Sequence, residues 1–382
     1  MNDLLLSEEE RLLKSTVAEF ADRELAPRAA DYDARAEFPW DNIRGLAKLG
    51  LLGLTIEEEY GGSGGSFRPM ALTMEEIARG CGGTSVIYGA HLMLCALFIH
   101  KFGTEGQKSR FLPPLARGEK LGAFALTEAG SGSDAAAMKT TATRSDGHYV
   151  LNGSKMFITN AVEADTFVVM ATRDPDLGRG GVVSLVMEKD TEGLTVNPLH
   201  GKMGMRATSA AELVFEDCAV PEENRLGPEA EGFRQTMQVL TASRIGIGAQ
   251  CVGIAQAAYE AAVSYAKQRE AFGRHIADFQ AIQWMIADMA TGIDAARLLV
   301  LRAAELRDKG MPYLTEASMA KLFASRVAVD SADKAMQIHG GSGYFAPSPV
   351  ERHYRDAKVT EIYEGTSEIQ RLIIARNILD TD

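Results

Sequence analysis

The sequence predicts a protein of the α+β class, mostly α, in which one β portion separates two helical portions. Apolar residues recur at helical spacing from residue 3 to about residue 120, short segments rich in Val, Phe, Ile and Thr begin near residue 121, and helical spacing returns after Pro228. Strands and helices do not alternate, which argues against a doubly wound nucleotide-binding sheet. We therefore expect an N-terminal helical domain over residues 1–120, a middle β domain over 121–228 and a C-terminal helical domain over 229–382.

The first helical portion is defined by an apolar stripe and by its breaks. One helix face carries Leu13, Val17, Phe20 and Ala21. Residues 38–40 (FPW) are expected to separate two helices, residues 60–66 (YGGSGGS) to form a loop, and Pro113-Pro114 to end another helix. No strand is expected before residue 121.

The middle portion is expected to contain strands over residues 166–171 and 182–187. Its clearest local signal is Asn152-Gly153, because this pair tolerates the positive φ angles of a type I′ turn. Residues 149–151 and 156–158 flank the pair. We therefore expect a hairpin that turns at Asn152-Gly153.

Long packed helices are expected in the last portion. No proline occurs between Pro228 and Pro312, and one helix face carries Ile282, Met285, Ile286, Met289 and Ile293. Gly246, Gly248 and Gly253 stand inside a helical pattern, which favours close helix packing over a phosphate-binding loop.

Composition narrows the function classes. A net charge of −12 over 382 residues disfavours nucleic-acid and anionic-membrane partners. The four cysteines lack CxxC spacing and the seven histidines form no HExxH pattern, so neither a disulfide framework nor a metal site is expected. The N-terminus is acidic, and no uninterrupted apolar run is expected to be long enough to span a bilayer. We expect a soluble, cytoplasmic protein without membrane insertion.

Two segments are suited to an anionic or heteroaromatic ligand. Residues 124–134 (FALTEAGSGSD) run from a β-like stretch into a loop whose glycines and hydroxyls permit close approach, although no Gly-x-Gly-x-x-Gly opens a helix there. In residues 269–280, Arg269 offers donors suited to a pyrophosphate and Gln280 can pair with it. The plain alternatives are a loop that only turns the chain and a solvated, charged helix connection.

Two further segments lie in the last portion. Residues 337–341 (QIHGG) permit close backbone approach to a ligand, or they mark a helix C-cap. Residues 362–370 (IYEGTSEIQ) place Glu364 before a glycine and before a helix start at Thr366 or Ser367, with Ser367 and Gln370 as a capping box. A carboxylate at such a turn can project into a pocket and act as a base, although most exposed glutamates do not.

Taken together and in this order, the four segments resemble the acyl-CoA dehydrogenase family, from about residue 5 to residue 377. Further agreement comes from Gly204-Met205-Arg206, from residues 212–221 (ELVFEDCAVP) and from residues 352–368 (RHYRDAKVTEIYEGTSE). The resemblance implies an N-terminal helical domain, a middle β-barrel or sandwich domain and a C-terminal four-helix bundle. It also implies FAD as the cofactor and a homotetramer.

The resemblance assigns roles by matched position. In the family, the stretches that match residues 269–280 and 337–341 reach the FAD of a neighbouring subunit. The family's catalytic base matches Glu364. The sequence departs from the commonest pattern at Phe157, often tryptophan, and at Ala129, often proline. The FAD contacts match Phe124, Leu126, Thr127, Gly132, Ser133, Phe157, Ile158, Thr159, Arg269, Phe272, Gln280, Gln337, Ile338, Gly340, Gly341, Thr366 and Glu368, and the acyl-CoA contacts match Ser133, Arg244, Tyr363 and Gly365.

The implied reaction removes hydrogen from the α and β carbons of a short, medium or branched acyl-CoA, in fatty-acid or amino-acid breakdown. Its product is a trans-2-enoyl-CoA, and electron-transfer flavoprotein accepts the electrons. Glu364 would take the α proton, and burial would raise its pKa. The acyl pocket would lie along the helix that carries Val86, Tyr88, Gly89, Leu92 and Cys95. Two alternatives stay open: a flavin oxidase of the same fold, and a non-catalytic FAD-containing binding protein.

Overall fold

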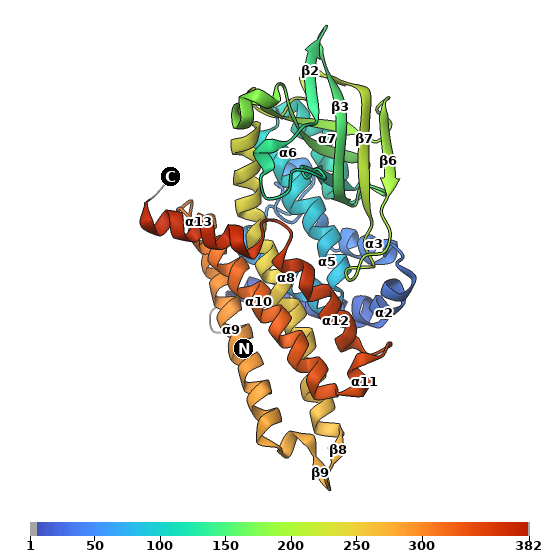
Figure 1. Ribbon diagram of the computed structural model, residues 1–382, viewed down its shortest axis with the longest axis vertical. Helices are drawn as coiled ribbons and strands as arrows, with labels where there is room; N and C mark the ends of the chain where they lie inside the picture. Colours follow the sequence, from blue (N-terminus) through green and yellow to red (C-terminus); the bar gives the residue numbers. More distant parts are fainter. Residues whose placement is uncertain (1–5, 381–382) are drawn as a thin grey trace.

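The computed structural model describes residues 6–380, so the outermost parts of the expected 1–120 and 229–382 ranges lie outside the described residues. Figure 1 shows a curled sheet at one end of the molecule and long helices that run to the other end. One apolar core joins the helices of both ends of the chain, and a second core lies within the sheet region. The order of helical, β and helical portions is as predicted.

The N-terminal portion is helical throughout its described residues. Val17 and Ala21 of the predicted stripe are fully buried, and Leu13 and Phe20 pack against the core. The helices break at Pro39, as expected. The elements are α1 (Glu8–Phe20), η2 (Ala21–Leu25), α2 (Ala26–Arg35), α3 (Trp40–Lys48), η3 (Leu51–Gly53), η4 (Glu58–Tyr60), α4 (Phe67–Gly80), α5 (Gly82–Gly89), η5 (Ala90–Ala96), α6 (Leu97–Phe102) and α7 (Glu105–Ala116).

The expectation that Pro113-Pro114 ends a helix is wrong, because α7 continues to Ala116. A proline costs a helix its own N–H donor, but its carbonyl still accepts a hydrogen bond. Arg117 donates its backbone N–H to the Pro113 carbonyl at 3.1 Å, and Glu119 donates to Pro114 at 2.9 Å. The two prolines therefore lie within the last turn of α7 and are tolerated there.

The expectation that no apolar run is long enough to span a bilayer is wrong for the continuous helix Gly82–Phe102. It has 21 residues and a mean hydropathy of 1.6, which suffice to cross a membrane by length and composition. However, 89% of its most apolar window is buried inside the protein. Within it, buried His91 accepts the Gly122 N–H at Nδ1 and contacts the Leu115 carbonyl through Nε2. This helix is the core of the N-terminal portion, and its hydropathy reflects that burial.

Seven strands form one sheet in the order β1-β4-β2-β3-β7-β6, with β5 paired to β4. Strands β1 and β4 run parallel, whereas β2 with β3, β3 with β7, β4 with β5, and β6 with β7 are antiparallel. The predicted strands at 166–171 and 182–187 are confirmed. The strands are β1 (Gly122–Ala125), β2 (Thr141–Ser145), β3 (His148–Thr159), β4 (Thr166–Thr172), β5 (Val182–Glu188), β6 (Leu194–Pro198) and β7 (Ala210–Pro221), with the short helices η6 (Ala135–Ala137), η7 (Pro175–Gly181) and η8 (Glu222–Asn224).

The predicted hairpin turn at Asn152-Gly153 is wrong, because both residues lie in the middle of β3. The turn between β2 and β3 is Asp146-Gly147, with φ angles of 44° and 81°. Asn152 instead exchanges two hydrogen bonds with Asp217 of β7. Gly153 is needed for packing, because a Cβ atom there would lie 2.8 Å from the Thr140 Cα.

The C-terminal portion is built on long packed helices, as expected, and α8, α9 and α10 are the longest of those described. The glycines of α8 allow close packing: a Cβ atom on Gly253 would lie 2.2 Å from the Glu75 carbonyl oxygen, and one on Gly248 would lie 2.8 Å from Val300. The elements are α8 (Gly232–Gln268), β8 (Glu270–Ala271), β9 (Arg274–His275), η9 (Ile276–Asp278), α9 (Gln280–Asp308), α10 (Leu314–His339), α11 (Gly341–Tyr344), α12 (Pro349–Lys358), η10 (Val359–Glu361) and α13 (Ser367–Leu379).

A buried ion pair fixes the loop after β1 to strand β3. The Lys155 side chain is fully buried, and its Nζ donates to Glu128 Oε1 at 2.8 Å and to the Leu126 carbonyl at 3.0 Å. Glu128 also accepts the backbone N–H groups of Lys139 and Thr140. Burial would raise the pKa of Glu128, but Lys155 and the two N–H groups outweigh it and lower the pKa.

We predict that Glu128→Gln lowers the free energy of unfolding by about 3–5 kcal/mol, because the substitution leaves the Lys155 ammonium buried without its counter-charge. The midpoint of denaturant unfolding measures this loss. Glu119→Gln is the matched control, since Glu119 and Arg117 form an exposed pair and its removal should cost about 1 kcal/mol or less. Equal losses for the two variants would contradict the assigned role of Lys155.

Candidate functional site

Glu364 lies in a tight turn between η10 and α13. Its φ angle is 52°, which is uncommon for a residue other than glycine, and Gly365 follows with a φ of 99°. Thr366 is the N-cap of α13 and accepts the Ile369 N–H at 3.3 Å, so the expected capping box of Ser367 and Gln370 is wrong. The buried Gln370 side chain instead donates to the Gly365 carbonyl at 3.0 Å. The chain therefore holds Glu364 in a fixed, strained turn.

The Glu364 carboxylate points to the middle of α8 and accepts a hydrogen bond from the Ser243 hydroxyl. Burial raises the pKa of Glu364 above its ordinary value, while Ser243, Lys321 and Arg244 act in the opposite direction. A carboxylate with a raised pKa is a stronger base than one in water. The setting gives Glu364 the chemical character of a general base.

Arg244 follows Ser243 on α8 and is only 4% exposed. Its Nε and Nη1 atoms have no hydrogen-bond partner within residues 6–380. Burial lowers the pKa of Arg244 to about 10, against the pull of Glu364, so the guanidinium stays charged at neutral pH. Buried donors without acceptors are costly, and a polar ligand beside Glu364 would satisfy them.

Helix α5 connects the Glu364 turn to the end of strand β3. Tyr363 donates its hydroxyl to Gln250 Oε1, and Gln250 donates to Ser85 Oγ at 2.7 Å. Two residues further along α5, the Ile87 carbonyl accepts from Asn160 Nδ2 at 3.1 Å. Residues 157–160 and 363–364 are thus anchored to the same helix, which continues into the segment predicted to line an acyl pocket.

The end of β3 presents an aromatic side chain at a β-bulge. The pairing with β7 shifts register between Lys155 and Ile158, and Phe157 there has a φ of 62° and is 67% exposed. Met156 donates its N–H to the Thr127 carbonyl at 2.8 Å, which fixes the bulge to the loop after β1. The sequence-predicted segments 124–133 and 157–159 are therefore brought together.

This region has the features of a heteroaromatic binding surface. The hydroxyls of Thr127 and Thr159 have no hydrogen-bond partner in the described part of the chain. Gly132 and Ser133 are exposed, and a Cβ atom built on Gly132 would meet nothing within 4 Å. Leu126 and Thr127 are half-buried, while Phe124 and Ile158 belong to the core. The exposed ring of Phe157, the open hydroxyls of the two threonines and the glycine-rich loop are together suited to an isoalloxazine ring system.

The remaining predicted FAD contacts lie elsewhere in the chain. Arg269, Phe272 and Gln280 lie on and beside the β8–β9 hairpin, which Figure 1 shows at the end of the helical bundle away from the sheet, with α11 near it. Phe272 is 95% exposed. Gln337, Gly340 and Gly341 are exposed at the end of α10, and Ile338 is buried in the core. Thr366 caps α13, and Glu368 is exposed on it. Within one chain, the residues at the β8–β9 hairpin and at the end of α10 therefore lie apart from the segments 124–133 and 157–159.

The sequence analysis missed two residues that contact the Glu364 turn. Lys321 of α10 donates to the Gly365 carbonyl at 2.8 Å, and Ser243 donates to the carboxylate itself. The signal for Lys321 was present: it is a lone cation within an otherwise apolar or small stretch of residues 317–325 (ASMAKLFAS). A buried lysine needs a partner, which is reason to single it out.

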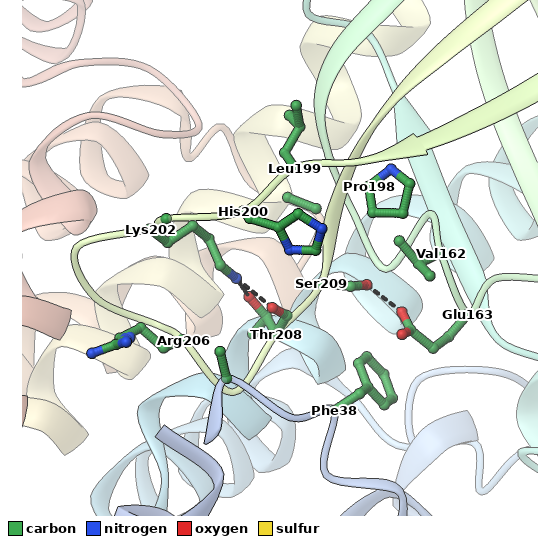
Figure 2. Close-up of a pocket in the computed structure, with 13 residues that line it drawn as sticks. Phe38, Val162, Glu163, Pro198, Leu199, His200, Lys202, Arg206, Thr208 and Ser209 are labelled. Atoms are coloured by element: carbon green, nitrogen blue, oxygen red, sulfur yellow. Dashed lines mark hydrogen bonds between the residues drawn. The ribbon is translucent and has the colours of Figure 1, made fainter. Parts of the chain in front are cut away.

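Figure 2 shows a separate hollow of about 310 Å³, between the loop before α3 and the segment between β6 and β7. Some of its polar groups are paired with one another: Lys202 bonds to Met205 and Thr208, and Ser209 to Glu163. None of the predicted site residues lines it. The hollow is lined by Ala36, Phe38, Val162, Glu163, Pro198, Leu199, His200, Gly201, Lys202, Arg206, Thr208, Ser209 and Ala210.

Three family models match the chain: the N-terminal domain of acyl-CoA dehydrogenase over residues 7–119, the middle domain over 123–218 and the C-terminal domain over 230–379. The short-chain specific acyl-CoA dehydrogenase of Clostridium acetobutylicum is 46% identical, with 98% of this chain and 99% of that protein aligned. Among solved structures, butyryl-CoA dehydrogenase from Megasphaera elsdenii is 42% identical, with a TM-score of 0.96 and coverage of 98% and 99%. A chain in a structure of the electron transferring flavoprotein of Acidaminococcus fermentans is 46% identical, with a TM-score of 0.97 and coverage of 99% for both chains.

The matches extend over nearly the whole chain and confirm both the resemblance and the three-part fold inferred from the sequence. The turn that holds Glu364, the α8 residues that contact it and the bulge at Phe157 all lie within the matched ranges. This protein belongs to the acyl-CoA dehydrogenase family.

Proposed function

We propose that the protein is an FAD-dependent dehydrogenase that converts a short acyl-CoA into the trans-2-enoyl-CoA and passes the electrons to electron-transfer flavoprotein. One observation carries this proposal: a half-buried carboxylate, Glu364, lies beside a buried arginine whose donors are open. Family membership and the names of the two bacterial dehydrogenases that match support the same reaction. The structure of the Acidaminococcus flavoprotein supports the electron acceptor. We also propose that the domain limits are 1–120, 121–228 and 229–382.

FAD fits the residues that the chain offers. The open hydroxyls of Thr127 and Thr159, the exposed Phe157 and the loop at Gly132 would hold the ring system. Thr366 and Glu368 lie on the helix that follows the Glu364 turn and would contact the same cofactor. When bound, the flavin supplies the acceptor for the hydride that leaves the β carbon. The protein's own contribution is to bind, align and exclude water.

Glu364 would remove the α proton of the acyl-CoA. The α C–H beside a thioester is only weakly acidic, so the developing negative charge on the carbonyl oxygen must be stabilised. The backbone N–H of Glu364 has no acceptor within residues 6–380 and would donate to that oxygen. Ser133, Arg244, Tyr363 and Gly365 would contact the acyl-CoA, and the core helix at Val86, Tyr88 and Leu92 would line the acyl chain.

We also propose that the protein is a homotetramer in which a second chain contributes residues to each FAD site. Arg269, Phe272, Gln280 and residues 337–341 lie at the far end of the helical bundle, so their FAD contacts require a second copy of the chain. The proposed setting is cytoplasmic, in keeping with the bacterial source of the Clostridium relative. A flavin oxidase remains the alternative within this fold, and reaction of the reduced flavin with oxygen distinguishes the two.

The first prediction concerns the base. Anaerobic addition of butyryl-CoA should bleach the flavin of the purified protein, and Glu364→Gln should abolish bleaching while the protein keeps its FAD, because the amide cannot accept the α proton. Flavin absorbance measures both properties. Glu216→Gln, an exposed change on β7, is the control and should bleach normally. Bleaching that persists in Glu364→Gln would remove Glu364 from the role.

The second prediction concerns pH. Burial raises the pKa of Glu364 above its model-peptide value of 4.5, so its carboxylate is lost at a higher pH than that of an exposed glutamate. The acid limb of kcat/KM should therefore report an apparent pKa above 4.5. The measurement is the rate of flavin bleaching at low butyryl-CoA concentration from pH 3.5 to 9. An acid limb with an apparent pKa at or below 4.5 would contradict the proposed base.

The third prediction concerns the subunit interface. Arg269→Gln should lower the ratio of bound FAD to protein, because its guanidinium would contact the cofactor of a neighbouring chain. Arg326→Gln, an exposed change on α10, is the control and should retain FAD. Sedimentation should give four chains per particle for the wild-type holoprotein. A monomer with a full complement of flavin would refute the shared site.

A further inference from the structure

Lys321 is a fully buried lysine in the middle of α10. Lysine is almost never fully buried without a partner, because taking an ammonium out of water is costly. The ammonium carries three donors, and its hydrogen bond within the described chain goes to the Gly365 carbonyl at 2.8 Å. The helix that carries Lys321 is otherwise packed through small residues, among them Ala317, Ala320 and Ala324. The position therefore has a cation where packing alone would favour an apolar side chain.

The bond from Lys321 restrains the turn that aims Glu364. Glu364 and Gly365 are consecutive residues with φ angles of 52° and 99°, a conformation that persists only when neighbouring groups hold it. The Gly365 carbonyl receives two donors, Lys321 Nζ at 2.8 Å and Gln370 Nε2 at 3.0 Å. Lys321 comes from α10 and Gln370 from α13, so the turn is held from two sides.

Lys321 also contributes charge to the site. The ionisable groups that interact with it are Glu364, Glu361, Glu368, Arg244 and Cys251. Burial lowers the pKa of Lys321 to about 8, so the ammonium predominates at neutral pH. Together with Arg244 it gives two buried cations around the Glu364 carboxylate, although the whole chain carries a net charge of −12. Positive neighbours stabilise the ionised form of a carboxylate against the cost of burial.

We infer that Lys321 is a positioning residue for Glu364: its ammonium holds the Gly365 carbonyl, so that the carboxylate faces the bound acyl group and remains ionised before that group arrives. This inference rests on the proposed function. It differs from a purely structural role, in which Lys321 would only stabilise the junction between α10 and α13. A structural role predicts lower stability with an unchanged dependence of the reaction on pH.

Two substitutions separate the hydrogen bond from the charge. Lys321→Met removes both, whereas Lys321→Gln removes the charge and keeps an N–H donor on a side chain one bond shorter. Gln370→Leu removes the other donor to this carbonyl and leaves all charges in place. Lys334→Met is the matched control, because Lys334 lies on the same helix at a half-buried position outside the site. Each holoprotein is mixed anaerobically with butyryl-CoA, and the rate of flavin bleaching is followed from pH 5 to 10.

We expect Lys321→Met to slow bleaching by about 100-fold, the scale of a misplaced reacting group. Its acid limb should move to higher pH, because loss of a positive neighbour raises the pKa of Glu364. Lys321→Gln should show the same shift of the acid limb with a smaller loss of rate. Gln370→Leu should lose rate without the shift, and Lys334→Met should match the wild type.

The outcomes distinguish this inference from the proposed function. If the wild-type protein is not bleached by butyryl-CoA or by longer acyl-CoAs, the proposed function itself fails. If the wild type bleaches and the Lys321 variants retain its rate and its acid limb, the positioning role is overturned. If neither Lys321 variant retains FAD, the pH profile of the wild type provides the test. The bleaching rate of the wild type should change near pH 8, because Lys321 loses its proton there. A bleaching rate that does not change between pH 7 and pH 10 would overturn the inference.

Discussion

The site depends on holding one half-buried carboxylate, Glu364, at the tip of a strained turn. Burial makes Glu364 a better base, but the same burial disfavours its charge and would favour the neutral acid. The protein offsets this cost with Ser243 and Arg244 on α8 and Lys321 on α10, while Gln370 on α13 holds the turn through the Gly365 carbonyl. Because these groups come from separate parts of the chain, the assembled C-terminal helices are a precondition for the chemistry.

The rest of the fold fixes the positions of the loop after β1 and of the end of β3 relative to the Glu364 carboxylate. Helix α5 receives hydrogen bonds from Gln250 on one side and from Asn160 on the other. The Lys155–Glu128 pair holds the loop after β1 against the bulge that exposes Phe157. Small residues let the backbones approach, as at Gly253, where even a methyl group would collide with the Glu75 carbonyl. Packing and hydrogen bonds thus hold the loop after β1, the bulge at Phe157 and the Glu364 turn in place.

The sequence predicted the order of the portions well, since apolar periodicity is a local property and residues 13–21 and 282–293 show it plainly. Where two segments carried the same local signal, the sequence alone could not decide which of them forms the structure. Asn152-Gly153 and Asp146-Gly147 both suit a type I′ turn, and only the pairing of β3 with β7 decides which pair turns. The helix that carries Val86 and Leu92 was expected, but the length of its apolar run was not, and its hydropathy has meaning only once its burial is known.

The candidate site was found in part because its motifs are short and contiguous. Glu364 and Arg244 were identified by matched position, but the bond from Ser243 to Glu364 spans 121 residues of sequence and the bond from Lys321 to Gly365 spans 44. Such contacts follow from helix packing, which no local pattern encodes. Lys321 was detectable only as a charge in an apolar stretch, and its partner could not be read from the sequence.

The central claim is that Glu364 and the flavin act on neighbouring carbons of one acyl group. Anaerobic bleaching rates with butyryl-CoA deuterated at the α carbon, and separately at the β carbon, test it most directly. The account predicts that each deuteration slows bleaching, since one bond is broken by Glu364 and the other by transfer to the flavin. Bleaching at the same rate with both deuterated substrates and with unlabelled butyryl-CoA would contradict it.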